Sequence, residues 1–147
     1  MATTDYIDSK KTKELDIYTD GGSRGNPGNA AIGVVIYNSD GLAVEKVSEY
    51  IGEATNNQAE YNALIVGLQE AQNYKAKSVH CYLDSELVVK QMKGQYKVKN
   101  ENMKPLFTVV QGLIKNFESV KFTHIPREKN KEADRLVNLA LDKAKKS

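Results

Sequence analysis

The order in which the chain changes its hydrophobic period constrains its fold more than any other feature. Alternation of apolar and polar residues predicts a strand over 15–20, and a run rich in valine and isoleucine predicts a second over 30–37. A third strand is predicted to return over 42–51. The connections 21–28 and 38–41 are short and rich in glycine, asparagine and aspartate, which is typical of turns. Strands joined this closely pair antiparallel, so we predict an antiparallel three-stranded unit first.

After the third strand the period becomes helical and then alternates. Thr55 is the expected N-cap of a helix that runs to about Tyr74. Further helices are predicted over 85–92, 103–117 and 130–145, and further strands over 78–83 and 119–125. Helices between successive strands require crossovers and parallel pairing. We therefore predict an α/β fold with a mixed five-stranded sheet, three antiparallel strands and then two parallel ones, flanked by helices.

Length and composition narrow the class of protein. The 147 residues suit a single domain. We expect a flexible polar tail over 1–12 and the domain over 13–147. No apolar run approaches the 18 residues of a membrane span, and the tail lacks the apolar segment of a secretory signal. The only cysteine, Cys81, cannot form an intrachain disulfide, which favours the reducing cytoplasm. We expect a monomer.

Four carboxylates stand out against this pattern. Asp20 ends the first predicted strand and Asp84 ends the fourth, so both emerge at the carboxyl edge if these strands are parallel neighbours ~5 Å apart. Glu60 and Asp134 border the apolar faces of their helices. Each has a simpler interpretation, as a turn former, a helix cap, a first-turn acid or a surface acid. Convergence of all four at one edge favours a site.

Bringing carboxylates together is costly. A pair of like charges ~4 Å apart repels by about 4 kcal/mol at an effective dielectric constant near 20. No lysine or arginine lies beside all four in the sequence to offset this repulsion. Mg²⁺ and Mn²⁺ prefer oxygen ligands, and two such ions can activate a water and stabilise a leaving oxygen. The pattern thus indicates metal-assisted phosphodiester hydrolysis.

The segments that carry these acids resemble the four motifs of type 1 ribonuclease H. They are YTDGGS at 18–23 with GNPG at 25–28, TNNQAE at 55–60, LDS at 83–85 and NKEAD at 130–134. The motifs follow in family order over about residues 13–142. The resemblance implies a ribonuclease H fold and an endonuclease that cuts the RNA strand of RNA–DNA hybrids. It also implies a two-metal mechanism with 5′-phosphate and 3′-hydroxyl products.

The resemblance assigns roles by position. It implies that two Mg²⁺ ions, or Mn²⁺ as a substitute, bind Asp20, Glu60, Asp84 and Asp134, with Asp20 bridging them. It places the hybrid against Gly21, Gly22, Ser23, Asn26, Thr55, Asn56, Asn57 and Asn100. Glycine allows close approach of the backbone to a sugar, and a helix N-terminus favours a phosphate. The alternative, that 55–57 only build the start of a helix, stays open.

The chain departs from the family in the loop before the last aspartate, where many members carry a histidine. Here 126–130 reads PREKN, and Arg127 is the expected substitute. An arginine can contact the scissile phosphate or help the product leave, but it cannot serve as a neutral base. Simple electrostatic attraction of nucleic acid is an equal alternative role for Arg127. Glu128 is an alternative to Arg127 as the functional residue of this loop, and it would modulate a metal. His80 and His124 lie within strands and are expected to be structural or exposed.

A second departure from the family concerns the residues that bind the substrate. Some members have a basic, tryptophan-bearing insertion, whereas this chain has no tryptophan and only a small lysine patch, formed by Lys90, Lys93, Lys97, Lys99 and Lys104. We therefore expect weaker and more salt-sensitive binding.

Three other functions compete with ribonuclease H. They are a nuclease of the same fold with another substrate, a non-catalytic nucleic-acid-binding domain and a small metal-binding protein. The four carboxylates argue against the second, and the lysine patch and motif order argue against the third.

Overall fold

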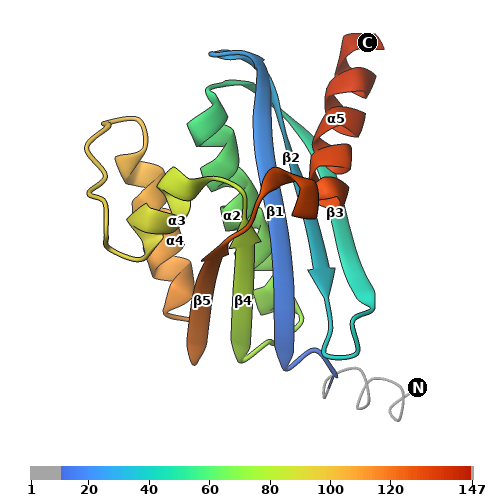
Figure 1. Ribbon diagram of the computed structural model, residues 1–147, viewed down its shortest axis with the longest axis vertical. Coiled ribbons are helices and arrows are strands. Elements are labelled where there is room, and N and C mark those ends of the chain that lie inside the picture. Colours follow the sequence, from blue (N-terminus) through green and yellow to red (C-terminus); the bar gives the residue numbers. More distant parts are fainter. Residues whose placement is uncertain (1–10, 147) are drawn as a thin grey trace.

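The computed structural model describes residues 11–146 (Figure 1). The elements follow the predicted order. They are β1 (Glu14–Gly25), β2 (Gly28–Tyr37), β3 (Ala43–Ala54), α2 (Asn56–Asn73), β4 (Ser78–Leu83), α3 (Glu86–Met92), α4 (Lys104–Ile114), β5 (Ser119–His124), the 3-10 turn η1 (Arg127–Lys129) and α5 (Lys131–Lys146).

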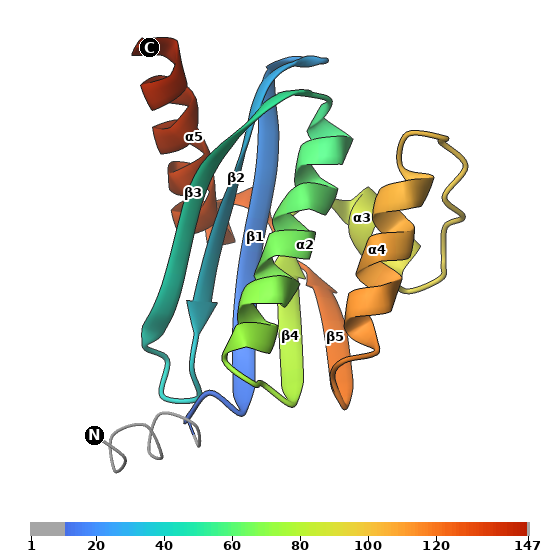
Figure 2. The ribbon, with the colours of Figure 1, turned by 180° about the vertical axis from the view of Figure 1, so that it is seen from behind.

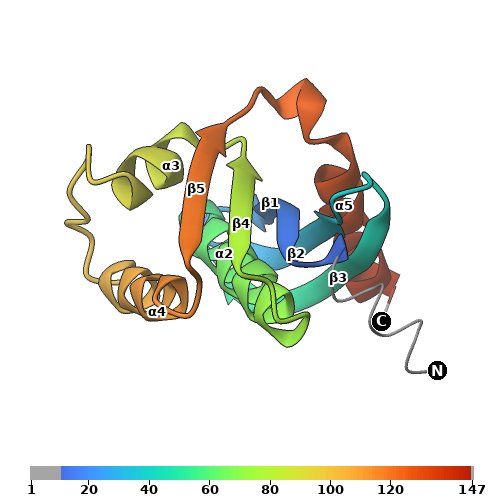
Figure 3. The same cartoon turned by 90° about the horizontal axis from the view of Figure 1, so that it is seen from below.

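The strands form one mixed sheet in the order β3-β2-β1-β4-β5. β2 pairs antiparallel with both β1 and β3, whereas β4 pairs parallel with both β1 and β5. Helices α2 and α4 lie on one face, and α5 lies on the other face over β2 and β3 (Figures 2 and 3). The predicted fold class is confirmed, and β1 and β4 are central neighbours.

The main core lies between the sheet and α2. Alternate residues of β1 and β4, including Leu15, Ile17 and Leu83, point toward α2 and are fully or almost fully buried. Cys81 is wholly buried in the same layer, and burial raises the pKa of its thiol. A second, smaller cluster packs α5 against β2. These two layers leave the carboxyl ends of β1 and β4 between α2 and α5.

The first strand is longer than predicted. The glycine-rich segment 21–28 was expected to be a turn, but β1 continues to Gly25 and remains paired with β2 to the register Gly25–Gly28. Backbone pairing with β2 provides hydrogen bonds that outweigh the weak strand preference of these glycines. A side chain at Gly28 would come within 2.2 Å of the Arg24 carbonyl oxygen, so the tight turn requires glycine there. Asp20 therefore lies inside β1 instead of at its end.

Other boundaries differ less. The predicted capping box of α2 is confirmed: Gln58 N–H donates to Thr55 Oγ1 (3.1 Å) and Thr55 N–H donates to Gln58 Oε1 (2.9 Å). The last helix was predicted to start at residue 130, but η1 precedes it and α5 starts at Lys131. The helix predicted over 103–117 ends earlier, at Ile114.

Most of the predicted tail, residues 1–10, lies outside the described residues. Its last two residues belong with the domain: Thr12 is buried, and Lys11 Nζ lies 2.9 Å from Asp40 Oδ2. Lys11 and Thr12 therefore pack against the domain. Among the residues described, no helix has the length and apolarity that crossing a bilayer requires.

Candidate active site

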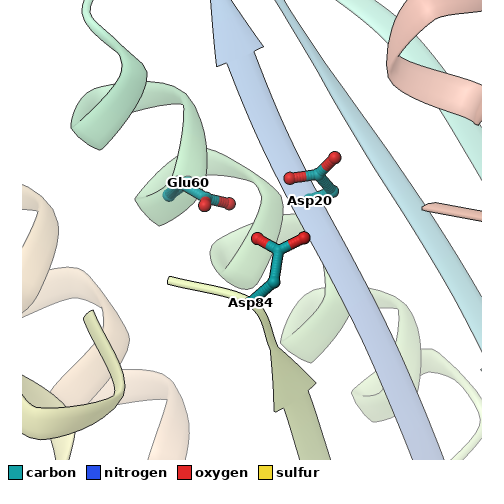
Figure 4. Close-up of side chains that lie close together, drawn as sticks. All are labelled: Asp20, Glu60 and Asp84. Atoms are coloured by element: carbon teal, nitrogen blue, oxygen red, sulfur yellow. The ribbon is translucent and has the colours of Figure 1, made fainter. Parts of the chain in front are cut away.

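Three carboxylates converge where β4 ends beside the middle of β1. Asp20 comes from β1, Glu60 from α2 and Asp84 from the residue after β4 (Figure 4). Each offers one oxygen, and these oxygens all lie within 4.8 Å of one another. The register brings Asp20 and Asp84 together, because Thr19 lies opposite Leu83 and an aspartate follows each of these two residues in the sequence. Asp20 and Glu60 are buried and Asp84 is half-buried.

A direct backbone contact between β1 and α2 positions Glu60. Gly21 N–H donates to Glu60 Oε1 at 2.8 Å. A Cβ at Gly21 would lie 2.2 Å from the carbonyl carbon of Ala59, so only glycine allows the helix this close. Glu60 is the fifth residue of α2 and is buried, so its interpretation as a first-turn acid is wrong.

Asp84 is not a helix cap, which was its simpler interpretation. The N-cap of α3 is Ser85, whose Oγ accepts a hydrogen bond from Val88 N–H at 3.3 Å. The Asp84 carboxylate is therefore free to face Asp20 and Glu60.

Asp134 stands beside this group of three. It lies in the first turn of α5, close enough to Asp20 to raise the pKa of that carboxyl. Arg127 Nη2 lies 3.5 Å from Asp134 Oδ1, and the Arg127 side chain is 78% exposed. The acid predicted to be the fourth ligand thus has one cation near it in this structure.

The cluster is electrostatically strained. Burial, followed by repulsion from Asp84 and Asp134, raises the pKa of Asp20 to about 8. Burial, followed by repulsion from Asp20 and Asp84, raises the pKa of Glu60 well above its ordinary value. Burial also raises the pKa of Asp84. A bound divalent cation would offset this repulsion, and a set of three converging carboxylate oxygens suits a hard ion such as Mg²⁺.

The strain predicts an unusual pH dependence of stability without metal. Asp20 stays protonated in the folded chain up to about pH 8, whereas its ordinary pKa is 3.8. The stability present below pH 3.8 is therefore lost as the pH rises toward 8, with a slope of up to about 1.4 kcal/mol per pH unit for one group. Urea unfolding in EDTA between pH 5 and 8.5 measures this decline. Asp20→Asn should flatten it, and an equal slope in that variant would contradict the assignment to Asp20.

Asn130 is a component of the site to which the sequence pattern assigned no role of its own. It is 2% exposed, and its Nδ2 donates to the Thr19 carbonyl oxygen (2.8 Å) and to Asp84 Oδ2 (3.4 Å). Its Oδ1 has no hydrogen-bond partner within the described part of the chain. Asn130 thereby ties the start of α5 to β1 and to Asp84. An asparagine directly before a helix is typical of an N-cap, so the sequence indicates only a local role for Asn130 and not its contacts with β1 and Asp84.

We predict that Asn130→Ala loses about 1–3 kcal/mol of stability and also lowers kcat, because both the Thr19 carbonyl and Asp84 lose a donor. Urea unfolding and steady-state kinetics measure the two effects. Asn116→Ala is the matched control, since the Asn116 side chain donates to Gln72 (3.2 Å) at an exposed position. A destabilised Asn130→Ala with the kcat of the parent would show that Asn130 has no part in positioning Asp84.

Two neighbouring cavities contain the residues predicted to contact substrate. The first, of about 320 Å³, lies over the carboxylates and is also lined by Gly21, Gly22, Ser23 and Arg127. The second, of about 380 Å³, is lined by Asn26, Thr55, Asn56, Asn57 and Asn100. Asn56 borders both. The structure therefore divides the predicted contact residues into two adjacent groups.

Several of these residues also hold one another. The backbone N–H and the hydroxyl of Ser23 both donate to Asn56 Oδ1, at 2.9 and 3.1 Å, and Asn56 N–H donates to Asn26 Oδ1 at 3.0 Å. These bonds join the end of β1 to the start of α2. The alternative that 55–57 help to build the helix start therefore has structural support, alongside their place at the cavities.

The remaining candidates lie farther from the cluster or on its margin. His80 hydrogen-bonds Thr123 and stacks on Tyr82, in keeping with a structural role. His124, at the exposed end of β5, is near enough to Asp84 to lower the pKa of that carboxyl. Glu128 lines a separate cavity beside the start of α5 and not the one over the carboxylates.

The lysine patch is partly neutralised. Lys90 Nζ lies 3.6 Å from Glu86 Oε1, and Lys104 Nζ lies 2.8 Å from Glu101 Oε1. Lys90 also lies over the Tyr96 ring, 4.9 Å from its centroid.

The chain is similar in sequence to a known protein family and to several curated proteins. Residues 18–140 match the reverse transcriptase-like protein family. A ribonuclease HI of Halobacterium salinarum is 42% identical over 141 residues, which cover 96% of this chain and 71% of that protein. A bifunctional protein of Mycobacterium tuberculosis is 44% identical over 132 residues, which cover 89% of this chain. This chain spans only 36% of the length of that protein and of two other mycobacterial relatives.

Solved structures of two RNase H1 proteins have a similar fold. The crystal structure of RNase H1 from Halobacterium salinarum has a TM-score of 0.86 at 40% identity, with 88% of this chain and 98% of that chain covered. LC11-RNase H1 in complex with an RNA/DNA hybrid has a TM-score of 0.85 at 48% identity, with the same coverage.

Proposed function

Because this chain belongs to the ribonuclease H type 1 family, we propose that it is an endonuclease that hydrolyses the RNA strand of RNA–DNA hybrids. The products are a 5′-phosphate and a 3′-hydroxyl. The observation that carries this proposal is the convergence of Asp20, Glu60 and Asp84 within 4.8 Å, with Asp134 beside Asp20. The relative LC11-RNase H1, described in complex with an RNA/DNA hybrid, supports the substrate.

The four carboxylates would hold two Mg²⁺ ions, for which Mn²⁺ can substitute. Asp20 suits a shared position, because its carboxyl interacts with Glu60, Asp84 and Asp134 alike. When bound, the ions would activate the attacking water and stabilise the leaving oxygen. The protein supplies the negative charge and holds it rigidly: Glu60 through the Gly21 backbone and Asp84 through Asn130.

Other residues would bind and orient the hybrid. The Arg127 guanidinium, at the rim of the cavity, would contact the phosphate, because an arginine cannot serve as a neutral base. The backbone of 21–23 lines the same cavity and would approach the 2′-hydroxyls, which distinguish RNA from DNA. The second cavity, at the N-terminus of α2 with Thr55 and Asn100, would take a phosphate of the DNA strand.

The protein would act as a cytoplasmic monomer, with residues 13–147 as the catalytic domain. The four carboxylates all come from one chain, so the proposed site needs no residue from a second copy. A single, buried, unpaired cysteine supports a reducing compartment.

Cleavage of an end-labelled RNA–DNA hybrid tests the activity, in Mg²⁺ and in EDTA, beside duplex RNA and duplex DNA. We expect cutting of the hybrid alone, and only with the metal. Cutting of duplex RNA as well would mean a broader substrate. Cutting of none of the three would overturn the proposal and favour a non-catalytic nucleic-acid-binding domain.

A further inference from the structure

Two of the three arginines of the chain line the cavity over the carboxylates. The nearest acid of Arg127 is Asp134, a proposed metal ligand. Arg24 is held instead by α5: its Nη2 lies 2.8 Å from Asp142 Oδ1 and donates to Asn138 Oδ1 at 3.3 Å. Neither Asp142 nor Asn138 belongs to the carboxylate cluster. The Arg24 guanidinium is therefore fixed at the rim by partners that metal binding would not recruit.

Arg24 projects from the same face of β1 as Asp20. The register of β1 with β2 is regular from Asp16 to Gly25, so side chains alternate and Asp20, Gly22 and Arg24 share one face. At ~3.3 Å per residue, the Cα atoms of Asp20 and Arg24 are about 13 Å apart along the strand. Gly22 lies between them without a side chain. A nucleic-acid backbone that passes over Asp20 can follow this bare strand to Arg24.

The guanidinium retains donors for a ligand. Both contacts with α5 use Nη2, and among the residues described no protein group accepts from Nε or Nη1 of Arg24. Arg135, the third arginine, provides the contrast. Its Nε and Nη2 both donate to Glu132, at 2.7 and 3.2 Å, which occupies the fork that would otherwise recognise an anion. Arg24 is thus anchored but not saturated.

We propose that Arg24 binds a backbone phosphate of the RNA strand that flanks the phosphate being cut, and that Asp142 and Asn138 position its guanidinium. This inference rests on the proposed function. A polyanion that approaches a cavity lined by four acids is repelled, so it needs donors at the rim. Asp142 balances part of the Arg24 charge, and Arg24 therefore contributes mainly through the Nε and Nη1 donors that it keeps for a phosphate oxygen. Arginine is suited to this role because its charge is permanent and its donors match phosphate oxygens.

Arg24→Gln tests the inference, with Arg135→Gln as the matched control, since both replace an exposed arginine that pairs with an acid. Hybrid binding is measured by fluorescence anisotropy in EDTA, where no cleavage is expected, and KM and kcat are measured in Mg²⁺. We expect Arg24→Gln to weaken binding about tenfold and to reduce the slope of log K against log salt by about one. The loss should appear in KM and not in kcat. Arg24→Lys should recover only part of it, and Arg135→Gln should match the parent.

Hybrids with one uncharged methylphosphonate linkage locate the contact. The parent protein should lose affinity when one particular flanking RNA linkage is neutralised, and Arg24→Gln should show no further loss at that linkage. Arg24→Gln that binds and cuts like Arg135→Gln would overturn this inference alone. Full additivity would overturn it too: in that case the Arg24→Gln substitution and the neutral linkage would weaken hybrid binding independently of each other at every linkage. Failure of the parent protein to bind or cut the hybrid would overturn the proposed function as well.

Discussion

Asp20→Asn is expected to abolish hydrolysis, with kcat lowered by about 10³-fold or more, or about 4 kcal/mol of transition-state stabilisation. Asp20 is the carboxylate that interacts with the other three, so its loss removes a ligand shared by both proposed ions. An amide is neutral and binds Mg²⁺ less well than a carboxylate. The measurement is single-turnover cleavage of the hybrid at saturating enzyme, which separates chemistry from binding.

The same variant should fold, and without metal it should be at least as stable as the parent. At pH 7 the Asp20 carboxyl, with its pKa raised to about 8, is mostly protonated in the folded state and resembles an amide in charge. The unfolded parent gains free energy by ionising this group, whereas the unfolded variant cannot. Thermal unfolding in EDTA at pH 7 should therefore give an equal or higher Tm for Asp20→Asn.

The control is Asp40→Asn, in the β2–β3 turn, where the aspartate is 48% exposed and pairs with Lys11. Asp40→Asn should leave the rate of hybrid cleavage, and the dependence of that rate on Mg²⁺, unchanged. If Asp20→Asn cleaved the hybrid at the rate of the parent, the assignment of the metal site would be wrong. If it failed to fold, Asp84→Asn, at a half-buried position, would provide the same test.

Gly21→Ala is expected to have the second largest effect, a loss of stability of about 3 kcal/mol or more together with most of the activity. The added Cβ would lie 2.2 Å from the carbonyl carbon and oxygen of Ala59 and 2.5 Å from the Glu60 nitrogen. All three are backbone atoms, so α2 must move away from β1 as a unit. The movement would break the bond from Gly21 N–H to Glu60 Oε1 and separate Glu60 from Asp20.

Urea unfolding measures the stability, and two other glycines are its controls. A Cβ at Gly22 would meet only Val137 Cγ1 at 3.7 Å, an ordinary contact, so Gly22→Ala should keep most of the stability. Gly112 lies inside α4 with nothing within 4 Å of its Cβ position, so Gly112→Ala should stabilise by about 0.5–1 kcal/mol through helix propensity. Gly21→Ala that unfolds like Gly22→Ala would contradict the close approach of α2 to β1.

Much of the fold could be predicted because its determinants are local. Alternation and helical periodicity reported the strands and helices, and the capping box at Thr55 marked the start of α2 within one turn. The end of β1 was mispredicted because it depends on a partner strand. Residues 21–25 have weak strand preference, and only pairing with β2 extends β1 past Asp20.

The candidate site also combines features that the local sequence predicts with features that depend on distant residues. The approach of Asp20, Glu60 and Asp84 to one another could be predicted, because a carboxylate next to a buried strand segment or an apolar helix face conflicts with the local pattern. The part played by Asn130 could not, since its partners Thr19 and Asp84 lie 111 and 46 residues away in the chain. Nor could the anchoring of Arg24 by α5, 114 residues distant at Asn138.

By itself, then, the sequence determined the order of the elements, the family resemblance and the acids that converge, since each is encoded in short-range periodicity or motif spacing. The tertiary structure alone decided how far β1 extends, which groups hold Glu60 and Asp84 in place, and which arginine keeps free donors. These features depend on hydrogen bonds and burial between distant segments. Such contacts are specified only when the whole sheet and its covering helices pack together.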